Sequence, residues 1–87
     1  MAQPPKAGPM SEYTLDCLGL KCPLPVFRAR KRLRDLRVGE VLCVMADDPM
    51  APLDLEHMAR EDGHILLEIT AHEGQSRARI EKGPAKA

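Results

Sequence analysis

Hydrophobic and polar residues follow one another in patterns that predict six regular elements. Residues 12–17 place Tyr13, Leu15 and Cys17 on one side and polar residues on the other, which is typical of a half-buried strand. Residues 24–36 repeat apolar side chains at helical spacing, which predicts an amphipathic helix. Its inward face is expected to consist of Val26, Ala29, Leu33 and Leu36.

The second half of the chain continues this succession of strands and helices. The apolar run at residues 41–46 predicts a central strand, and residues 51–61 predict a second helix that stops at Gly63. Residues 64–72 and 76–82 alternate again on either side of a tight turn, which predicts an antiparallel hairpin. The side chains expected to face inward are Leu53, Leu55, Met58, Ala59, Ile65, Leu67, Ile69, Ala71, Ala78 and Ile80.

This βαβαββ order predicts an α/β two-layer sandwich, with two helices on one face of a four-stranded mixed sheet. The folded domain is expected to span residues 12–82. Residues 1–11 hold three prolines and no hydrophobic period, so they are interpreted as a disordered tail. Residues 83–87 are interpreted as a frayed end.

Composition narrows the classes of function. Thirteen basic residues balance thirteen acidic ones, and the only aromatic residues are Tyr13 and Phe27, which argues against direct binding of nucleic acid by base stacking. Three cysteines make no even disulfide framework. No signal peptide or membrane-spanning run is visible, so we expect a cytoplasmic protein with free thiols.

The stretch Cys22-Pro23-Leu24-Pro25 is the candidate for chemistry. Proline is tolerated in the first helical turn, so Pro23 and Pro25 predict that Cys22 lies at or next to the N-cap, in a stiff and exposed turn. Unpaired backbone N–H groups, the helix dipole and Lys21 are expected to stabilise a thiolate there. The alternative is a buried, inert cysteine.

The other candidate side chains favour structural roles. Cys17 is interpreted as a half-buried structural residue, with a disulfide to Cys22 as the alternative, and Cys43 as a core residue. The histidines show no metal-ligand spacing, so no metal site is predicted, although His64 is kept as a possible site residue. Asp48 is interpreted as the cap of the second helix. The alternative places Asp47 and Asp48 near Cys22.

The residues from Leu15 to Val26, Leu-Asp-x-x-Gly-Leu-Lys-Cys-Pro-x-Pro-Val, resemble the signature of the TusA/SirA-like sulfur-carrier family with its CPxP motif. The resemblance covers residues 15–82 and continues through Gly39-Glu40, Asp47-Asp48-Pro49, Asp54 and Gly63-His64. It implies a fold similar to the C-terminal domain of translation initiation factor 3. Leu24 departs from the pattern, because a polar residue often stands there in the family.

The resemblance also implies a function. In the family, the motif cysteine accepts sulfane sulfur as a persulfide, commonly from a cysteine desulfurase, and passes it to an acceptor protein in tRNA thiolation, cofactor supply or sulfur metabolism. By position that cysteine is Cys22, with Lys21, Pro23, Pro25 and Asp48 in support. The protein would be a sulfurtransferase in the carrier sense, with no cofactor and no independent turnover.

Six Lys and Arg residues crowd positions 28–37. They are interpreted either as a solvated helix face or as a docking surface for a partner. The docking residues would be Leu24, Arg28, Arg30, Lys31 and Arg32. Two other functions stay open: an RNA-binding or regulatory module that uses the basic helix, and a thiol redox protein that uses Cys17 and Cys22.

Overall fold

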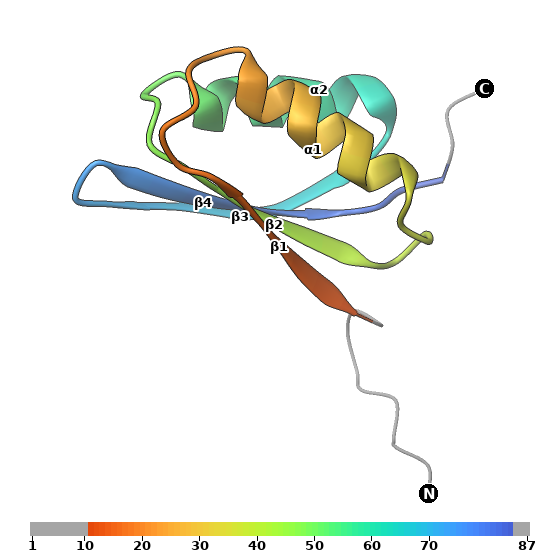
Figure 1. Ribbon diagram of the computed structural model, residues 1–87. Coiled ribbons are helices and arrows are strands. Elements are labelled where there is room, and N and C mark those ends of the chain that lie inside the picture. The colour runs from red at the N-terminus through yellow and green to blue at the C-terminus, as the bar shows by residue number, and fades with distance from the viewer. Residues whose placement is uncertain (1–10, 85–87) are drawn as a thin grey trace, which may run out of the picture.

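The computed structural model describes residues 11–84 and contains six regular elements in the predicted βαβαββ order (Figure 1). They are β1 (Glu12–Cys17), α1 (Leu24–Arg34), β2 (Val41–Ala46), α2 (Ala51–Asp62), β3 (Ile65–His72) and β4 (Gln75–Glu81).

One mixed sheet carries both helices. Its strand order is β1-β2-β4-β3, in which β1 runs parallel to β2 while the other neighbouring pairs are antiparallel. Both α1 and α2 lie on the same face of the sheet, as Figure 1 shows. The predicted two-layer sandwich is therefore confirmed.

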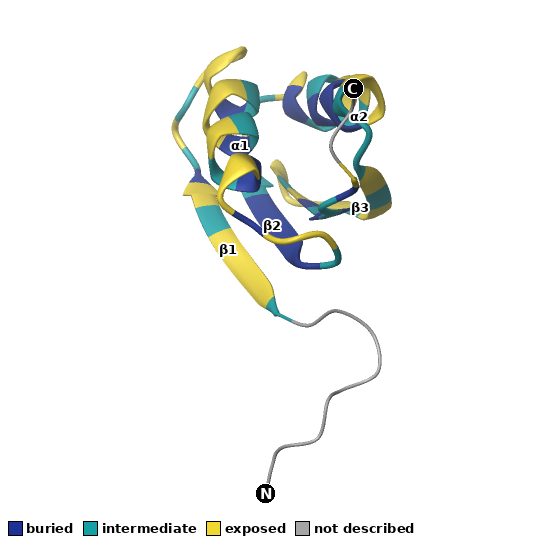
Figure 2. Ribbon diagram, turned by 90° about the vertical axis from the view of Figure 1, so that its right-hand side faces the viewer, coloured by how far each residue is buried: buried dark blue, intermediate teal, exposed yellow. Residues whose placement is uncertain are grey.

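The core lies between the helices and the middle of the sheet. The apolar run of β2 is buried along most of its length, whereas β1 at the sheet edge is largely exposed (Figure 2). Side chains of a strand alternate between its two faces, so every second residue of β2 points toward the helices. The fully buried side chains of this cluster include Leu33, Leu42, Val44, Leu55 and Ile80.

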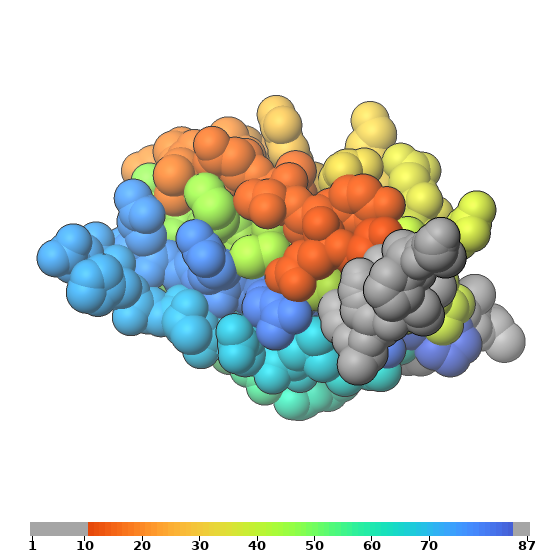
Figure 3. Space-filling view, turned by 90° about the horizontal axis from the view of Figure 1, so that it is seen from below, coloured from red at the N-terminus to blue at the C-terminus, as the bar shows by residue number. Residues whose placement is uncertain are grey.

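The other face of the sheet carries no helix and is seen from below in Figure 3. Cys43 is buried but belongs to this face, because its neighbours Leu42 and Val44 point to the helix side. Arg79 on β4 spans the strands here, with 2.8 Å between its Nε and Glu12 Oε2. Charged side chains of β1 and β4 thus lie over part of the face that the helices leave open.

The predicted inward face of β3 is wrong in part. A β-bulge lies between Leu66 and Glu68 in the pairing with β4, so Leu67 is an extra residue and the alternation changes phase. Leu66 and Ile69 pack against the core, whereas Ile65 is 48% and Leu67 40% exposed. Ala71, also expected inside, is exposed as well.

The helices follow the prediction more closely. Helix α1 ends at Arg34, two residues earlier than expected, yet Leu36 is still buried. In α2, Leu55, Met58 and Ala59 are buried as predicted, but Leu53 is 47% exposed. Gly63 ends α2 in the left-handed conformation, with φ 83°, as expected of a glycine C-cap.

Described residues on either side of 12–82 also form hydrogen bonds with the domain. The carbonyl of Ser11 accepts a hydrogen bond from Val41 N, and the buried Gly83 donates its N–H to His64 Nδ1 at 3.0 Å. The rest of the predicted tail and frayed end, residues 1–10 and 85–87, lies outside the described residues. Within residues 11–84, neither helix is long and apolar enough to cross a membrane.

Candidate functional site

Cys22 lies on the loop that joins β1 to α1, at the end of the sheet where β1 and β2 finish. Its side chain is exposed, whereas Cys17 and Cys43 are buried. Pro23 occupies the N-cap position of α1, and Pro25 in the first turn is buried against the core. Cys22 therefore stands next to the N-cap on an anchored loop, which confirms the predicted placement and exposure.

Two aspartates that follow β2 hold this loop from the side. Both carboxylate oxygens of Asp47 accept from Gly19 N, at 3.1 and 3.0 Å. Asp48 Oδ2 accepts from Cys22 N at 2.8 Å, and Asp48 Oδ1 accepts from Met50 N at 2.8 Å. The N–H groups of Cys22 and Met50 lower the pKa of Asp48, and the charge of Lys21 adds to this.

Asp48 is therefore not the cap of α2. The N-cap position belongs to Met50, and no side chain caps this helix by a hydrogen bond. The alternative interpretation, in which Asp47 and Asp48 line the surface near Cys22, describes the structure. The prediction erred because an aspartate three residues before a helix can satisfy either the helix or a neighbouring loop.

A third carboxylate contacts the sulfur itself. Asp54 lies in the first turn of α2, and its Oδ2 is 2.7 Å from Cys22 Sγ, so the thiol donates a hydrogen bond to the carboxylate. Sequence reasoning placed Asp54 in the family pattern and gave it no role. No spacing rule could have found the contact, because it joins residues of different elements.

The hydrogen bond to Asp54 raises the pKa of Cys22 above the ordinary thiol value, and desolvation and the charges of Asp54 and Asp48 act in the same direction. The expectation of an acidic thiol is therefore wrong for the isolated chain. The N–H groups at the start of α1 are already used, since Leu24 N donates to Lys21 O and Val26 N to Pro23 O. Lys21 acts on Asp48 instead.

The other two thiols are enclosed by protein. Cys17 is fully buried in the core beneath the helices, deeper than the half-buried position we predicted. Burial raises the pKa of both Cys17 and Cys43. All three cysteines are free thiols. Cys22 is thus the cysteine that a protein partner can reach.

Four of the five predicted docking residues line one groove of about 580 Å³ between α1 and β1. Leu24, Arg28, Lys31 and Arg32 share it with Leu15, Phe27 and Asp35. Leu24 is 45% and Phe27 56% exposed, so apolar anchors lie among cationic groups. Sequence reasoning noticed Phe27 only as one of two aromatics, although a large apolar residue on a basic helix face was the available signal.

Arg30 lies apart from this groove. Its Nε is 2.6 Å from Asp62 Oδ2, and its guanidinium also pairs with Glu61, so it ties α1 to α2. The basic residues of α1 therefore do not form one continuous cationic face.

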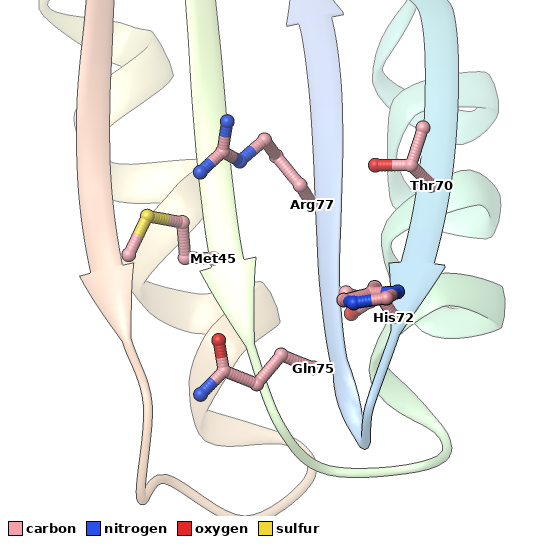
Figure 4. A pocket seen from close by; sticks show the side chains of 6 residues that line it. Met45, Thr70, His72, Gln75 and Arg77 are labelled. Atoms are coloured by element: carbon pink, nitrogen blue, oxygen red, sulfur yellow. The ribbon is translucent and has the colours of Figure 1, made fainter.

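His64 and His72 have partners other than Cys22. His64 Nδ1 accepts from Gly83 N, and burial lowers the pKa of His64. His72 lines a shallow recess of about 240 Å³ on the helix-free face, together with Met45, Thr70, Gln75, Ser76 and Arg77 (Figure 4). Within residues 11–84, no group of three or more His, Cys, Asp or Glu residues is placed to hold a metal ion.

Comparison with known proteins returns the family model "Sulfurtransferase TusA" over residues 13–82, a range that includes Cys22, Asp48 and Asp54. A Neisseria meningitidis serogroup A protein named "Putative sulfur carrier protein" is 48% identical over 65 residues, 75% of this chain and 88% of that protein. One of the same name from Archaeoglobus fulgidus is 46% identical over 55 residues, 63% of this chain and 71% of that protein. The crystal structure of a SirA-like protein from Desulfitobacterium hafniense superposes with a TM-score of 0.73 at 34% identity, covering 83% of this chain and 99% of that one.

Proposed function

The chain belongs to the TusA sulfurtransferase family, and from that premise we propose that it is a sulfur carrier: Cys22 accepts sulfane sulfur as a persulfide and relays it to an acceptor protein. The observation that supports this proposal is the difference in solvent exposure among the three cysteines. Cys22 is exposed on a loop fixed by Asp47 and Asp48, whereas the other two thiols are buried. A carrier needs one accessible sulfur and no competing one.

The loading step exchanges one sulfur–sulfur bond for another. The thiolate of Cys22 attacks the terminal sulfur of the donor persulfide, and the new bond forms as the S–S bond of the donor breaks. The donor leaves as a thiolate, which takes up a proton equivalent to the one that Cys22 lost. No oxidant, metal or cofactor enters this balance. Discharge to an acceptor is the same exchange with Cys22 as the leaving group.

A relay between proteins brings protein partners to Cys22 in both steps, and the groove beside α1 is suited to receive them. Leu24 and Phe27 offer apolar anchors, and Arg28, Lys31 and Arg32 surround them with positive charge. Such a surface favours a partner with an acidic rim around an apolar contact. A cysteine desulfurase or another persulfide donor would load the carrier, and an enzyme of tRNA thiolation, cofactor synthesis or sulfur metabolism would unload it, all in the reducing cytoplasm.

The test is loading with a small donor. Wild-type protein and the Cys22→Ser and Cys43→Ser variants are incubated with polysulfide, desalted and weighed as intact proteins. We expect one reducible sulfur on the wild type and on Cys43→Ser, and none on Cys22→Ser. Equal loading of Cys22→Ser would overturn the proposal.

A further inference from the structure

The contact between Cys22 and Asp54 is unusual for a nucleophile. At 2.7 Å from Sγ to Oδ2, the carboxylate is close enough to hold the thiol proton in a charge-assisted hydrogen bond. The two residues come from different elements, since Cys22 precedes α1 and Asp54 lies in the first turn of α2. The arrangement therefore depends on the packing of the two helices side by side.

The electrostatic surroundings of the thiol oppose its ionisation. Asp54 and Asp48 both face it with negative charge, and Lys21 on the preceding loop acts on Asp48. The N–H groups of Leu24 and Val26 already donate to the carbonyl oxygens of Lys21 and Pro23, so they are not available as donors to a thiolate. A thiolate at Cys22 would thus meet two carboxylates with little compensation.

Deepening the sulfur-carrier function proposed above, we propose that Asp54 controls the reactivity of Cys22. In the free carrier its carboxylate holds the thiol proton. A basic side chain of the docked partner pairs with Asp54 and offsets its charge, so the thiol gives its proton to solvent water and Cys22 reacts as the thiolate.

This arrangement has chemical consequences for both forms of the carrier. A protonated thiol is a poor nucleophile, so the free protein reacts slowly with oxidants and electrophiles. After loading, Cys22 Sγ is bonded to the added sulfur and carries no proton, so its hydrogen bond to Asp54 is lost. Discharge returns Cys22 to the thiol once a proton is taken up, and the hydrogen bond to Asp54 then forms again.

The surface around Asp54 indicates the chemistry of the group that releases the thiol. Met50 and Leu53, at the start of the same helix, are 49% and 47% exposed, so apolar side chains accompany the carboxylate. A Lys or Arg whose aliphatic part packs on these residues would reach Asp54 with its charge. Negative charge at Asp48 and Asp54 complements such a cation.

The first experiment measures the alkylation rate of Cys22 by iodoacetamide as a function of pH. In Asp54→Asn, we expect the midpoint to move to lower pH by about one unit, with several-fold faster alkylation near neutrality. Glu56→Gln removes a carboxylate from the same helix and should leave the midpoint unchanged. Asp54→Glu keeps a carboxylate at this position, so its midpoint should stay close to that of the wild type. An unchanged or higher midpoint in Asp54→Asn overturns the inference.

The second experiment tests the cation with methanethiosulfonate reagents of different charge. We expect a trimethylammonium reagent to modify wild-type Cys22 faster than a neutral one of similar size, and Asp54→Asn to abolish most of this preference. An equal preference in both proteins contradicts a role for Asp54 in receiving the cation. Neither experiment needs sulfur loading, so failure of the carrier function and failure of this inference remain distinguishable.

Discussion

Asp48 joins Cys22 to the start of the second helix through one carboxylate. Its Oδ2 accepts from the N–H of Cys22, and its Oδ1 accepts from the N–H of Met50, both at 2.8 Å. The position of the sulfur is therefore fixed by a side chain that follows β2, far from Cys22 in the sequence. Both bonds require acceptors, which a carboxylate supplies on two atoms and an amide on only one.

We predict that Asp48→Asn loosens the Cys22 loop. The amide can satisfy only one of the two N–H groups, so hydrogen exchange at the Cys22 amide should become faster than in the wild type. Asp16→Asn, near the end of β1 and bonded to Leu18 N, is the control. Unchanged exchange at Cys22 in Asp48→Asn would show that the carboxylate does not hold the loop.

Asp48 also makes the free energy of unfolding depend on pH in the acid range. Its pKa is lower in the folded chain, so the unfolded chain binds more protons in acid. The contribution is fully present above the ordinary carboxyl pKa and is lost as pH falls through the folded value. We expect urea unfolding of Asp48→Asn to lose less stability between about pH 5 and pH 3 than the wild type. An equal loss in both proteins would assign the acid sensitivity to other carboxylates.

His64 is expected to make the stability of the folded chain depend on pH in a second, higher range. Burial, followed by the charge of Lys82, lowers its pKa, and its Nδ1 must stay unprotonated to accept from Gly83 N. The stability it contributes is present above the ordinary histidine pKa and is lost as pH falls through the lower, folded value. Between about pH 7.5 and pH 5, the urea midpoint should therefore fall in the wild type. His64→Gln should flatten this dependence and the exposed His72→Gln should not.

Gly83 is predicted to tolerate no side chain. A Cβ atom at this position would lie well inside van der Waals contact of the Gly63 carbonyl, which is backbone and cannot turn away. We expect Gly83→Ala to lower the free energy of unfolding by about 1–3 kcal/mol, as overpacking usually does. The neighbouring Pro84 is exposed, so Pro84→Ala is the control. Equal stability of both variants would mean that the last residues are not packed against the end of α2.

The groove beside α1 predicts which charges act in docking. Arg28→Glu reverses a charge that lines the groove and should slow loading by a cysteine desulfurase roughly threefold to tenfold at low salt. The reason is that charges at the rim of an interface mainly affect the rate at which the two proteins associate. Arg34→Glu makes the same change on the same helix outside the groove and should have a smaller effect. Loading by polysulfide should be unchanged in both. If the desulfurase loads both variants equally slowly, the groove is not the docking surface.

The order of elements and the exposure of Cys22 could be predicted because both depend on local sequence. Apolar spacing determined the helices, and the prolines placed Cys22 before the first turn. The inward face of β3 could not be predicted, because the bulge at Leu67 is set by the pairing with β4 and reverses the alternation.

The electrostatics of the site depended on contacts between elements and were predicted wrongly. Unpaired N–H groups are a general property of helix starts, but here loop carbonyls occupy them. Asp54 reaches Cys22 only because α2 packs beside α1, and Arg30 leaves the proposed docking set because Asp62 on α2 binds it. In each case the missing information was the partner residue on another element.

The central claim, that Cys22 carries sulfur from one protein to another, is tested most directly by a single-turnover transfer of radiolabelled sulfur. The carrier is loaded by a cysteine desulfurase with labelled cysteine, separated from the donor, and mixed with an acceptor sulfurtransferase that has a reactive cysteine. We predict that the label leaves Cys22 and appears on the acceptor cysteine in equal amount, and that Cys22→Ser neither loads nor transfers. Label that stays on the carrier, or that Cys22→Ser transfers equally well, would contradict the account.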